Sequence, residues 1–421
     1  MKSGILNLKN KTRWILCIVT ILTVVACKKD NGYLGFTPGT GTPTISSVHT
    51  YYKTDTTTTY DTIITYNAAG QPVQTLQTNP PRIYAFDSVV TAANLGNTYQ
   101  IQGTNLGSTT LITFNGYTAY FNRALITDNS IIVQVPSKTP YLGAAANDSL
   151  VITTEHGKVG YKLVILPPAP TVASYSDFDF LGGSQITLTG VGFASVTSVK
   201  VSGTLGGSGS TSIVSQSDTV MVLQFDSTDV SRGFLTFSYN AGGQTDSAKG
   251  TQELVDIDNA YPVFAYGNIA PGWGSWSWDN AQISTTHFIT SASSWNAQYS
   301  GGGYKVDGFR NGGGNATDGL AYSPDYTYLV FWVYGGTAKE TLYILWGNEG
   351  FNNQGPNQIN GQTVLANQWN YFKIPISSLL WNTSTTNWAA NSSQNVNTVA
   401  FLMTSNSVTE QLYFDDVVLV K

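Results

Sequence analysis

The chain has 421 residues, of which 11% are charged and 12% are aromatic, and its formal net charge is −5. This length allows two to four domains, and so many aromatic side chains at such low charge exclude a disordered chain. The excess of acids makes a nucleic-acid partner unfavourable, because Lys and Arg must neutralise phosphates for such binding.

The first 26 residues carry the pattern of a lipoprotein signal peptide. Basic residues lie between Lys2 and Arg13 and precede a run of 13 apolar residues, too short to cross a bilayer comfortably. The run ends in Val24-Val25-Ala26 before Cys27, which resembles a lipobox. We expect cleavage before Cys27, lipidation of its side chain and anchoring of the chain in the outer membrane. A plain signal peptide with a chance cysteine is the alternative.

Cys27 is the only cysteine that remains after such cleavage, so no disulfide can form within the mature chain. Four of the 20 basic residues precede Cys27, which leaves 16 bases against 25 acids, a net charge of −9. Lys28-Lys29-Asp30 resembles the tag of surface-exposed lipoproteins, which implies a place on the cell surface. Residues 27–43 are rich in Gly, Thr and Pro and are predicted to be a flexible tether.

Residues 44–167 show short β-branched runs separated by Gly, Asn and Pro, a pattern typical of an all-β sandwich. Within them, the Thr-rich segment 51–66 is compatible with a long hairpin or with an insertion. The stretch Leu166-Pro167-Pro168-Ala169-Pro170 cannot donate ladder hydrogen bonds and is predicted to be a domain boundary.

After that boundary the pattern repeats. Residues 101–116 are echoed by residues 188–203, with pairs of glycines 13 residues apart in both copies, so residues 168–255 are predicted to form a second domain. The string Gly-Thr-Asn-Leu-Gly at 103–107, the Phe-Asn-Gly at 114–116 and the Thr-Asp-Asn-Ser at 127–130 resemble an IPT/TIG module, which is immunoglobulin-like. The second copy is degenerate. The resemblance implies two spacer modules.

Residues 256–421 are long enough for a larger sandwich, and their alternating runs predict a jelly roll without an amphipathic helix. Nine of the ten tryptophans lie here, between Trp273 and Trp388. An indole can cover the C–H face of a sugar ring while amides and carboxylates bind its hydroxyls, so this domain is predicted to bind carbohydrate. The fold class expected is therefore all-β, with tandem immunoglobulin-like sandwiches followed by a carbohydrate-binding sandwich.

The segment Pro-Gly-Trp-Gly-Ser-Trp-Ser-Trp-Asp-Asn at 271–280 is the strongest candidate site. In an extended strand Trp276 and Trp278 share one face and Trp273 lies on the other. Trp332 and Trp369 are predicted to be core residues, whereas Trp381 and Trp388 fit either a binding loop or a cover over the edge of the core. The candidate glycan-binding residues are Trp273, Trp276, Trp278, Trp295, Tyr299 and Trp346.

This last third is similar to the C-terminal domain of surface glycan-binding proteins that work beside starch-utilisation-type importers. The similarity is carried by Gly-Trp followed by Trp-x-Trp, by the strand Phe-Trp-Val-Tyr-Gly-Gly at 331–336, and by the closing run Tyr-Phe-Asp-Asp-Val-Val-Leu-Val at 413–420. It implies a non-catalytic protein that holds a polysaccharide such as xyloglucan or mixed-linkage glucan, with an outer-membrane importer as a further partner. The Gly-rich residues 308–322 depart from the pattern.

Two other functions stay open. A glycoside hydrolase needs two positioned carboxylates, but no Glu-x-Asp-x-Glu string is present in the last third. A surface adhesin that binds protein is the other alternative. No cofactor is expected except a structural calcium, for which Asp415 and Asp416 are the candidate ligands; acids exposed at a strand edge are the alternative for this pair.

Overall fold

The computed structural model describes residues 36–55, 60–66, 72–80, 82–85, 87–313, 317–348, 360–382, 384–404 and 406–421. The predicted signal peptide, Cys27 and the first part of the tether lie outside the described residues. In the part that is described, no helix has the length and apolar character needed to span a membrane.

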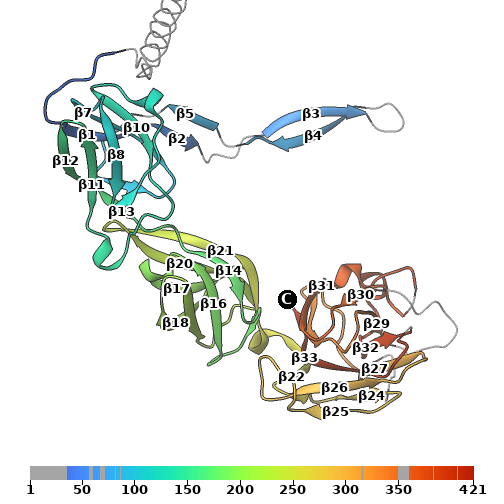
Figure 1. The fold of residues 1–421 in the computed structure, drawn as a ribbon. Helices are drawn as coiled ribbons and strands as arrows, with labels where there is room; N and C mark the ends of the chain where they lie inside the picture. Colours follow the sequence, from blue (N-terminus) through green and yellow to red (C-terminus); the bar gives the residue numbers. More distant parts are fainter. Residues whose placement is uncertain are drawn as a thin grey trace, which may run out of the picture. The chain divides into compact units, whose positions relative to one another are not determined.

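The chain is all-β, as predicted, and it divides into two compact units, Met1–Leu166 and Pro167–Lys421 (Figure 1). The division falls at the Pro-rich stretch that follows Leu166. The helices of the described residues are single turns of 3₁₀ helix: η1 (Arg123–Leu125), η2 (Gly143–Ala145), η3 (Phe193–Ser195), η4 (Ile257–Asn259), η5 (Ile376–Ser378) and η6 (Ala389–Asn391).

The first unit contains a sandwich with a three-stranded sheet (β1-β7-β10), a four-stranded sheet (β12-β11-β8-β9) and the parallel pair β13-β6. Two antiparallel pairs, β2-β5 and β3-β4, join strands of the Thr-rich segment to strands that follow it, so the paired region extends beyond residue 66. The strands are β1 (Thr44–Thr50), β2 (Tyr52–Asp55), β3 (Tyr60–Tyr66), β4 (Pro72–Thr78), β5 (Arg82–Ala85), β6 (Ala92–Asn94), β7 (Thr98–Thr104), β8 (Thr109–Phe114), β9 (Tyr117–Thr118), β10 (Ser130–Gln134), β11 (Ser149–Thr154), β12 (Gly157–Lys162) and β13 (Val164–Leu166).

The second unit begins with a smaller sandwich, called here the second module, whose strands follow the order β14-β16-β19-β18-β17-β20-β21-β15. Alternating apolar residues of these strands form its core, for example Leu235, Phe237 and Tyr239 in β20. The strands are β14 (Thr171–Tyr175), β15 (Asp179–Phe180), β16 (Gln185–Val191), β17 (Val196–Gly203), β18 (Ser208–Gln216), β19 (Val220–Phe225), β20 (Arg232–Ala241) and β21 (Gln244–Asp256).

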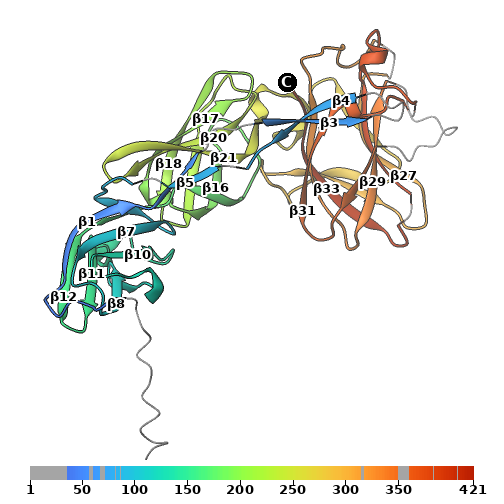
Figure 2. The same cartoon turned by 90° about the horizontal axis from the view of Figure 1, so that it is seen from above.

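The C-terminal sandwich packs a seven-stranded sheet, with β22, β23, β25, β26, β28, β31 and β33, against a five-stranded sheet in the order β24-β27-β32-β29-β30. Figure 2 shows β31 and β33 on one side of this sandwich and β27 and β29 on the other. The strands are β22 (Tyr261–Ala265), β23 (Asn268–Ile269), β24 (Trp273–Ser277), β25 (Ala281–Ser284), β26 (Ser294–Tyr299), β27 (Lys305–Asn311), β28 (Tyr328–Tyr334), β29 (Glu340–Gly347), β30 (Gly361–Val364), β31 (Trp369–Pro375), β32 (Thr398–Met403) and β33 (Glu410–Val420).

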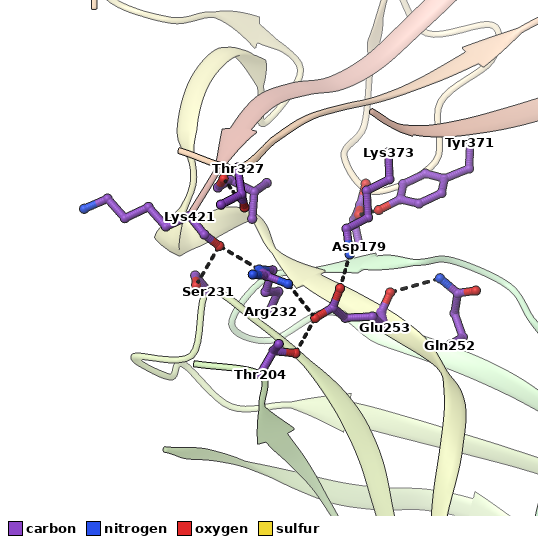
Figure 3. A network of polar contacts seen from close by, with 11 residues as sticks. Asp179, Thr204, Ser231, Arg232, Gln252, Glu253, Thr327, Tyr371, Lys373 and Lys421 are labelled. Carbon is purple, nitrogen blue, oxygen red and sulfur yellow. Dashed lines mark hydrogen bonds and ion pairs between the residues drawn. The ribbon is translucent and has the colours of Figure 1, made fainter. Parts of the chain in front are cut away.

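The second module and the C-terminal sandwich share an extensive joint. Glu253 of β21 accepts hydrogen bonds from Arg232 of β20 at 3.0 Å and from Lys373 of β31 (Figure 3). Arg232 Nε also donates to the main-chain carbonyl of Lys421 at 2.8 Å. Beside these polar contacts, the ring of Phe178 stacks on Trp332 of β28 with centroids 5.5 Å apart. The joint thus combines buried ion pairs with aromatic packing.

Candidate functional site

The strand β24 separates the tryptophans of the 271–280 segment onto two sides. Trp273 is only 8% exposed and packs in the main core between the two sheets. Trp276 lies three residues later and packs with residues on the opposite face of the five-stranded sheet, as strand parity predicts. Trp278 follows the end of β24, is 40% exposed and lies beside Tyr304 with ring centroids 6.2 Å apart.

The face of the five-stranded sheet that points away from the main core is called here the outer face. Its middle consists of small and medium apolar side chains, and larger aromatic side chains pack over them. The buried residues are Val306, Leu345, Ala400 and Leu402, and the partly buried aromatics are Trp276, Tyr304 and Tyr343. The pairings Trp276 to Gly308, Gly308 to Ala400 and Leu345 to Ala400 place these residues in one row across four strands.

Gly308 keeps the middle of the outer face flat. A Cβ atom at this position would lie 2.4 Å from the Cα of Ala400, so no larger side chain fits without a shift of the backbone. With glycine at 308 and alanine at 400, the side chains of the row are short between Trp276 on β24 and Leu345 on β29. Such a surface can accept a flat ring that lies along the row.

Polar groups lie at the margin of the outer face. The guanidinium carbon of Arg310 lies 5.8 Å from the centre of the Trp276 ring, and its buried Nε has no hydrogen-bond partner in the described structure. Near Trp278, the carboxylate of Asp279 accepts a hydrogen bond from the amide of Ser300 at 2.9 Å and lies 3.7 Å from Lys305 Nζ. The hydrogen bonds from Ser300, together with Lys305, hold the pKa of Asp279 below its usual value. The margin therefore offers both cationic donors and an ionised acceptor.

Four of the six candidate residues are buried, and their predicted contact with a ligand is wrong. Trp273, Trp295, Tyr299 and Trp346 all belong to the main core. In β26 the burial alternates, so that Trp295, Ala297 and Tyr299 face inward while Asn296 and Gln298 take the other face. The polar neighbours that suggested exposure lie on the opposite side of the strand.

Three of the remaining tryptophans, Trp332, Trp381 and Trp388, are buried, whereas Trp369 is partly buried. Trp332 is buried, as predicted, although it lies at the joint with the second module, and Trp369 packs against it edge to face. Trp381 and Trp388 are stacked with centroids 6.1 Å apart and are buried in the main core, so they do not form a binding loop. The Trp388 indole donates to the carbonyl of Gln394 at 2.9 Å, which explains why it can be fully buried.

Sequence reasoning missed Tyr304, Tyr343 and Arg310. A usable signal existed for Tyr343, because Leu342, Ile344 and Trp346 read as inward residues of one strand, and alternation then places Tyr343 on the outer face. Arg310 lies in the Gly-rich segment that departs from the family pattern, yet its strand β27 is regular up to Asn311. Tyr304 follows three glycines in a turn, where no alternation shows which face its ring takes.

Asp307 is the one strongly perturbed acid close to the outer face, among the described residues. Burial raises the pKa of Asp307 to about 7, although a hydrogen bond from Ser277 opposes the shift. The side chain of Asp307 is fully buried. Asp307 lies opposite Phe401 of the neighbouring strand β32, and Phe401 belongs to the main core. A ligand on the outer face therefore cannot reach this carboxyl group.

The two acids of the closing strand are not at an exposed edge. Asp415 and Asp416 are both 0% exposed, so the alternative of solvated acids is wrong. Within the described residues, no three side chains of His, Cys, Asp or Glu are already grouped as a metal site.

No protein-family model matches the chain. A curated relative, an IPT/TIG domain-containing protein of Bacteroides ovatus, is 33% identical over 119 residues, which are 28% of this chain. The match spans only 24% of the length of that relative.

Among solved structures, the chain is similar to a surface glycan-binding protein of Prevotella bryantii, with 16% identity, a TM-score of 0.46 and coverage of 91% of this chain and 99% of that one. A second similar structure is the SGBP-B protein from a complex xyloglucan utilization locus of Bacteroides uniformis, with 16% identity, a TM-score of 0.36 and coverage of 78% and 96%. The chain thus resembles IPT/TIG proteins and surface glycan-binding proteins, which is the resemblance its motifs indicated.

Proposed function

We propose that this chain is a non-catalytic, cell-surface protein that binds a polysaccharide on the outer face of its five-stranded sheet. The observation that carries the proposal is the row of Trp276, Gly308, Ala400 and Leu345, flat in the middle, with the aromatic rings of Trp276, Tyr304 and Tyr343 in the same cluster of the outer face. Aromatic rings supply a large apolar contact with few rotors to freeze, which suits the C–H faces of successive sugar rings.

The polar margin supports a hydroxyl-rich ligand. The Arg310 side chain is partly exposed and lies over the Trp276 ring, so its guanidinium group can donate to a sugar hydroxyl beside that ring. Asp279 is ionised and can accept hydrogen bonds from hydroxyl groups near Trp278.

The ligand is proposed to be a neutral plant β-glucan, such as xyloglucan or mixed-linkage glucan. The net charge of −9 after the predicted cleavage disfavours anionic polymers. A β-linked glucan presents flat sugar faces in succession along an extended chain, which matches a row of rings across several strands.

The place of the protein is proposed from its first residues. Lipidation of Cys27 would anchor the chain in the outer membrane, with residues 28–43 as a tether and two sandwiches before the binding sheet. A polysaccharide held at this distance from the membrane is available to surface enzymes and to a neighbouring importer.

The proposal is tested by affinity electrophoresis of the purified chain without its signal peptide in gels cast with a panel of soluble polysaccharides. We expect retardation by at least one β-glucan. Trp276→Ala and Trp278→Ala should each lower the affinity about tenfold, since truncated aromatic anchors typically cost at least that much. Circular dichroism and the melting temperature serve as controls that both variants are folded.

Tyr120→Ala is the matched control, because Tyr120 is 88% exposed but lies in the first unit. It should bind like the wild type. Wild-type affinity in both tryptophan variants would remove the outer face as the site. Release of reducing ends by the pure protein, abolished by one carboxylate substitution, would replace binding by hydrolysis as the function.

A further inference from the structure

Four aspartates from two modules are buried together at the joint. Asp177 and Asp179 belong to the second module, on either side of Phe178, whereas Asp415 and Asp416 belong to β33 of the C-terminal sandwich. All four are less than a tenth exposed. None of the ion pairs found in the described part of the chain involves any of them. Buried carboxyl groups without a basic partner must be neutralised by another means.

Hydrogen bonds satisfy part of this cluster. Asp177 accepts from the amide of Asp179 and from Thr290 Oγ1, both at 3.0 Å. Asp415 accepts from the amides of Ile289 and Asp416 at 3.0 and 3.1 Å. Asp177 is thus held by donors from both modules, and Asp415 by donors from the C-terminal sandwich.

Three oxygen atoms of the cluster lack a hydrogen bond of good geometry, although the Trp332 indole lies near Asp179 and Thr290, which donates to Asp177, lies near Asp416. Asp179 Oδ1 accepts from Tyr371 at 2.8 Å, but its Oδ2 is buried and has no hydrogen-bond partner. Asp416 is fully buried, and neither Oδ1 nor Oδ2 has a partner. The two carboxyl groups lie close enough for the charge of Asp416 to raise the pKa of Asp179, in addition to the larger effects of burial and of Asp177.

The backbone at Asp416 is also unusual. Asp416 lies where β33 shifts register against β28, and its φ angle of +47° is in the left-handed region that most side chains avoid. Such a conformation persists only where the surrounding structure imposes it, and Asp is among the residues that tolerate it best. Here the strained residue carries the two unpartnered oxygens.

We infer that the joint binds a divalent cation through the unpartnered oxygens of Asp179 and Asp416, one carboxylate from each module. Carboxylate oxygen is the ligand that hard cations such as Ca²⁺ and Mg²⁺ prefer, and sites with only two carboxylates are completed by water. The cation would link the second module to the C-terminal sandwich. It would fix the binding sheet on its spacer without taking part in glycan binding.

The test measures the melting temperature of the full mature chain after treatment with EDTA and after addition of Ca²⁺ or Mg²⁺. At a hundredfold excess over the dissociation constant, the cation should raise the melting temperature by about 5 to 10 °C. Asp179→Asn and Asp416→Asn should both abolish this rise. Each removes a buried charge, so both variants should fold at least as well as the metal-free wild type.

Asp307→Asn is the matched control, since Asp307 is an equally buried acid with one unpartnered oxygen, and neither Asp179 nor Asp416 is among the groups that shift its pKa. It should keep the cation-dependent rise. A direct readout is Tb³⁺ luminescence excited through tryptophan. Trp332 can serve as the donor, because it stacks on Phe178, which lies between Asp177 and Asp179 in the sequence. This signal should be lost in Asp179→Asn and Asp416→Asn.

A wild-type melting temperature that moves with neither EDTA nor added cation, together with no Tb³⁺ signal, would overturn the inference and leave protons as the neutralising species. A rise that persists in both asparagine variants would place the cation elsewhere and also overturn it. Polysaccharide binding is read separately by electrophoresis, so failure here is distinct from failure of the proposed function.

Discussion

The two sheets of the C-terminal sandwich use outward aromatic residues in opposite ways. On the seven-stranded sheet, Trp332 and Tyr371 contact Phe178 of the second module and are buried or partly buried by it. On the five-stranded sheet, Trp276 and Tyr343 pack over small residues of their own sheet and stay partly exposed. An outward tryptophan is therefore a binding candidate only where no neighbouring module covers it.

The largest loss of stability should follow from Trp332→Ala, on the face of the seven-stranded sheet that the second module covers. Trp332 stacks on Phe178 and also touches Tyr371, with centroids 4.7 Å apart, so its loss leaves a cavity at the joint. We expect the free energy of unfolding to fall by about 3 to 5 kcal/mol. Urea unfolding of the full mature chain, followed by circular dichroism, measures this change.

The same variant should bind polysaccharide like the wild type at a temperature where it is folded. Unchanged affinity would agree with a structural role for the covered side. Weakened binding by the folded variant would contradict the different roles given to the two sheets, because it would place the ligand on the seven-stranded sheet.

An intermediate change in stability is expected from Asp307→Asn, which lies in the five-stranded sheet beneath the outer face. The pKa of Asp307 is about 7 in the folded chain, chiefly because of burial, against about 4 when unfolded. The wild type therefore has its full stability below about pH 4 and loses part of it as the pH rises to 7. At pH 8 the variant should be more stable by about 1 to 3 kcal/mol, after the cost of an amide that lacks a partner.

Urea unfolding at pH 4, 6 and 8 measures this difference, which should vanish at the lowest pH. A constant difference across this range would mean that Asp307 does not titrate in the folded chain between pH 4 and 8. Glycan affinity should not change, since Asp307 faces the main core and not the outer face.

The face taken by the tryptophans of β24 was predictable, because the parity of Trp273 against Trp276 follows from strand alternation. The strands Tyr328–Tyr334 and Thr398–Met403 are instead continuous apolar runs, almost wholly buried, for which alternation gives no face. Trp295 and Tyr299 were misassigned because polar neighbours were read as a sign of exposure, whereas alternate residues of one strand lie on different faces.

The joint was not predictable. Phe178 and Trp332 are 154 residues apart, and no periodicity shows which outward face another module will cover. The same limit applies to the buried aspartates, since Asp415 and Asp416 read equally well as solvated residues at a strand edge. Their surroundings include Ile289, Thr290 and Asp177 of the second module, which lie far from them in the sequence.

The smallest effect should come from Tyr343→Ala, which tests how far the ligand extends across the outer face. Tyr343 lies on β29, two strands away from β27, pairs with Leu402 and belongs to the same apolar cluster as Trp276. If the ligand crosses the whole outer face, loss of the Tyr343 ring should weaken polysaccharide binding by about fivefold to tenfold, with a change in stability of about 1 kcal/mol or less. Tyr343→Phe keeps the ring and should bind within about twofold of the wild type if stacking is what matters. Wild-type affinity in Tyr343→Ala, measured by titration calorimetry beside Trp276→Ala, would confine the site to the edge formed by β24 and β27.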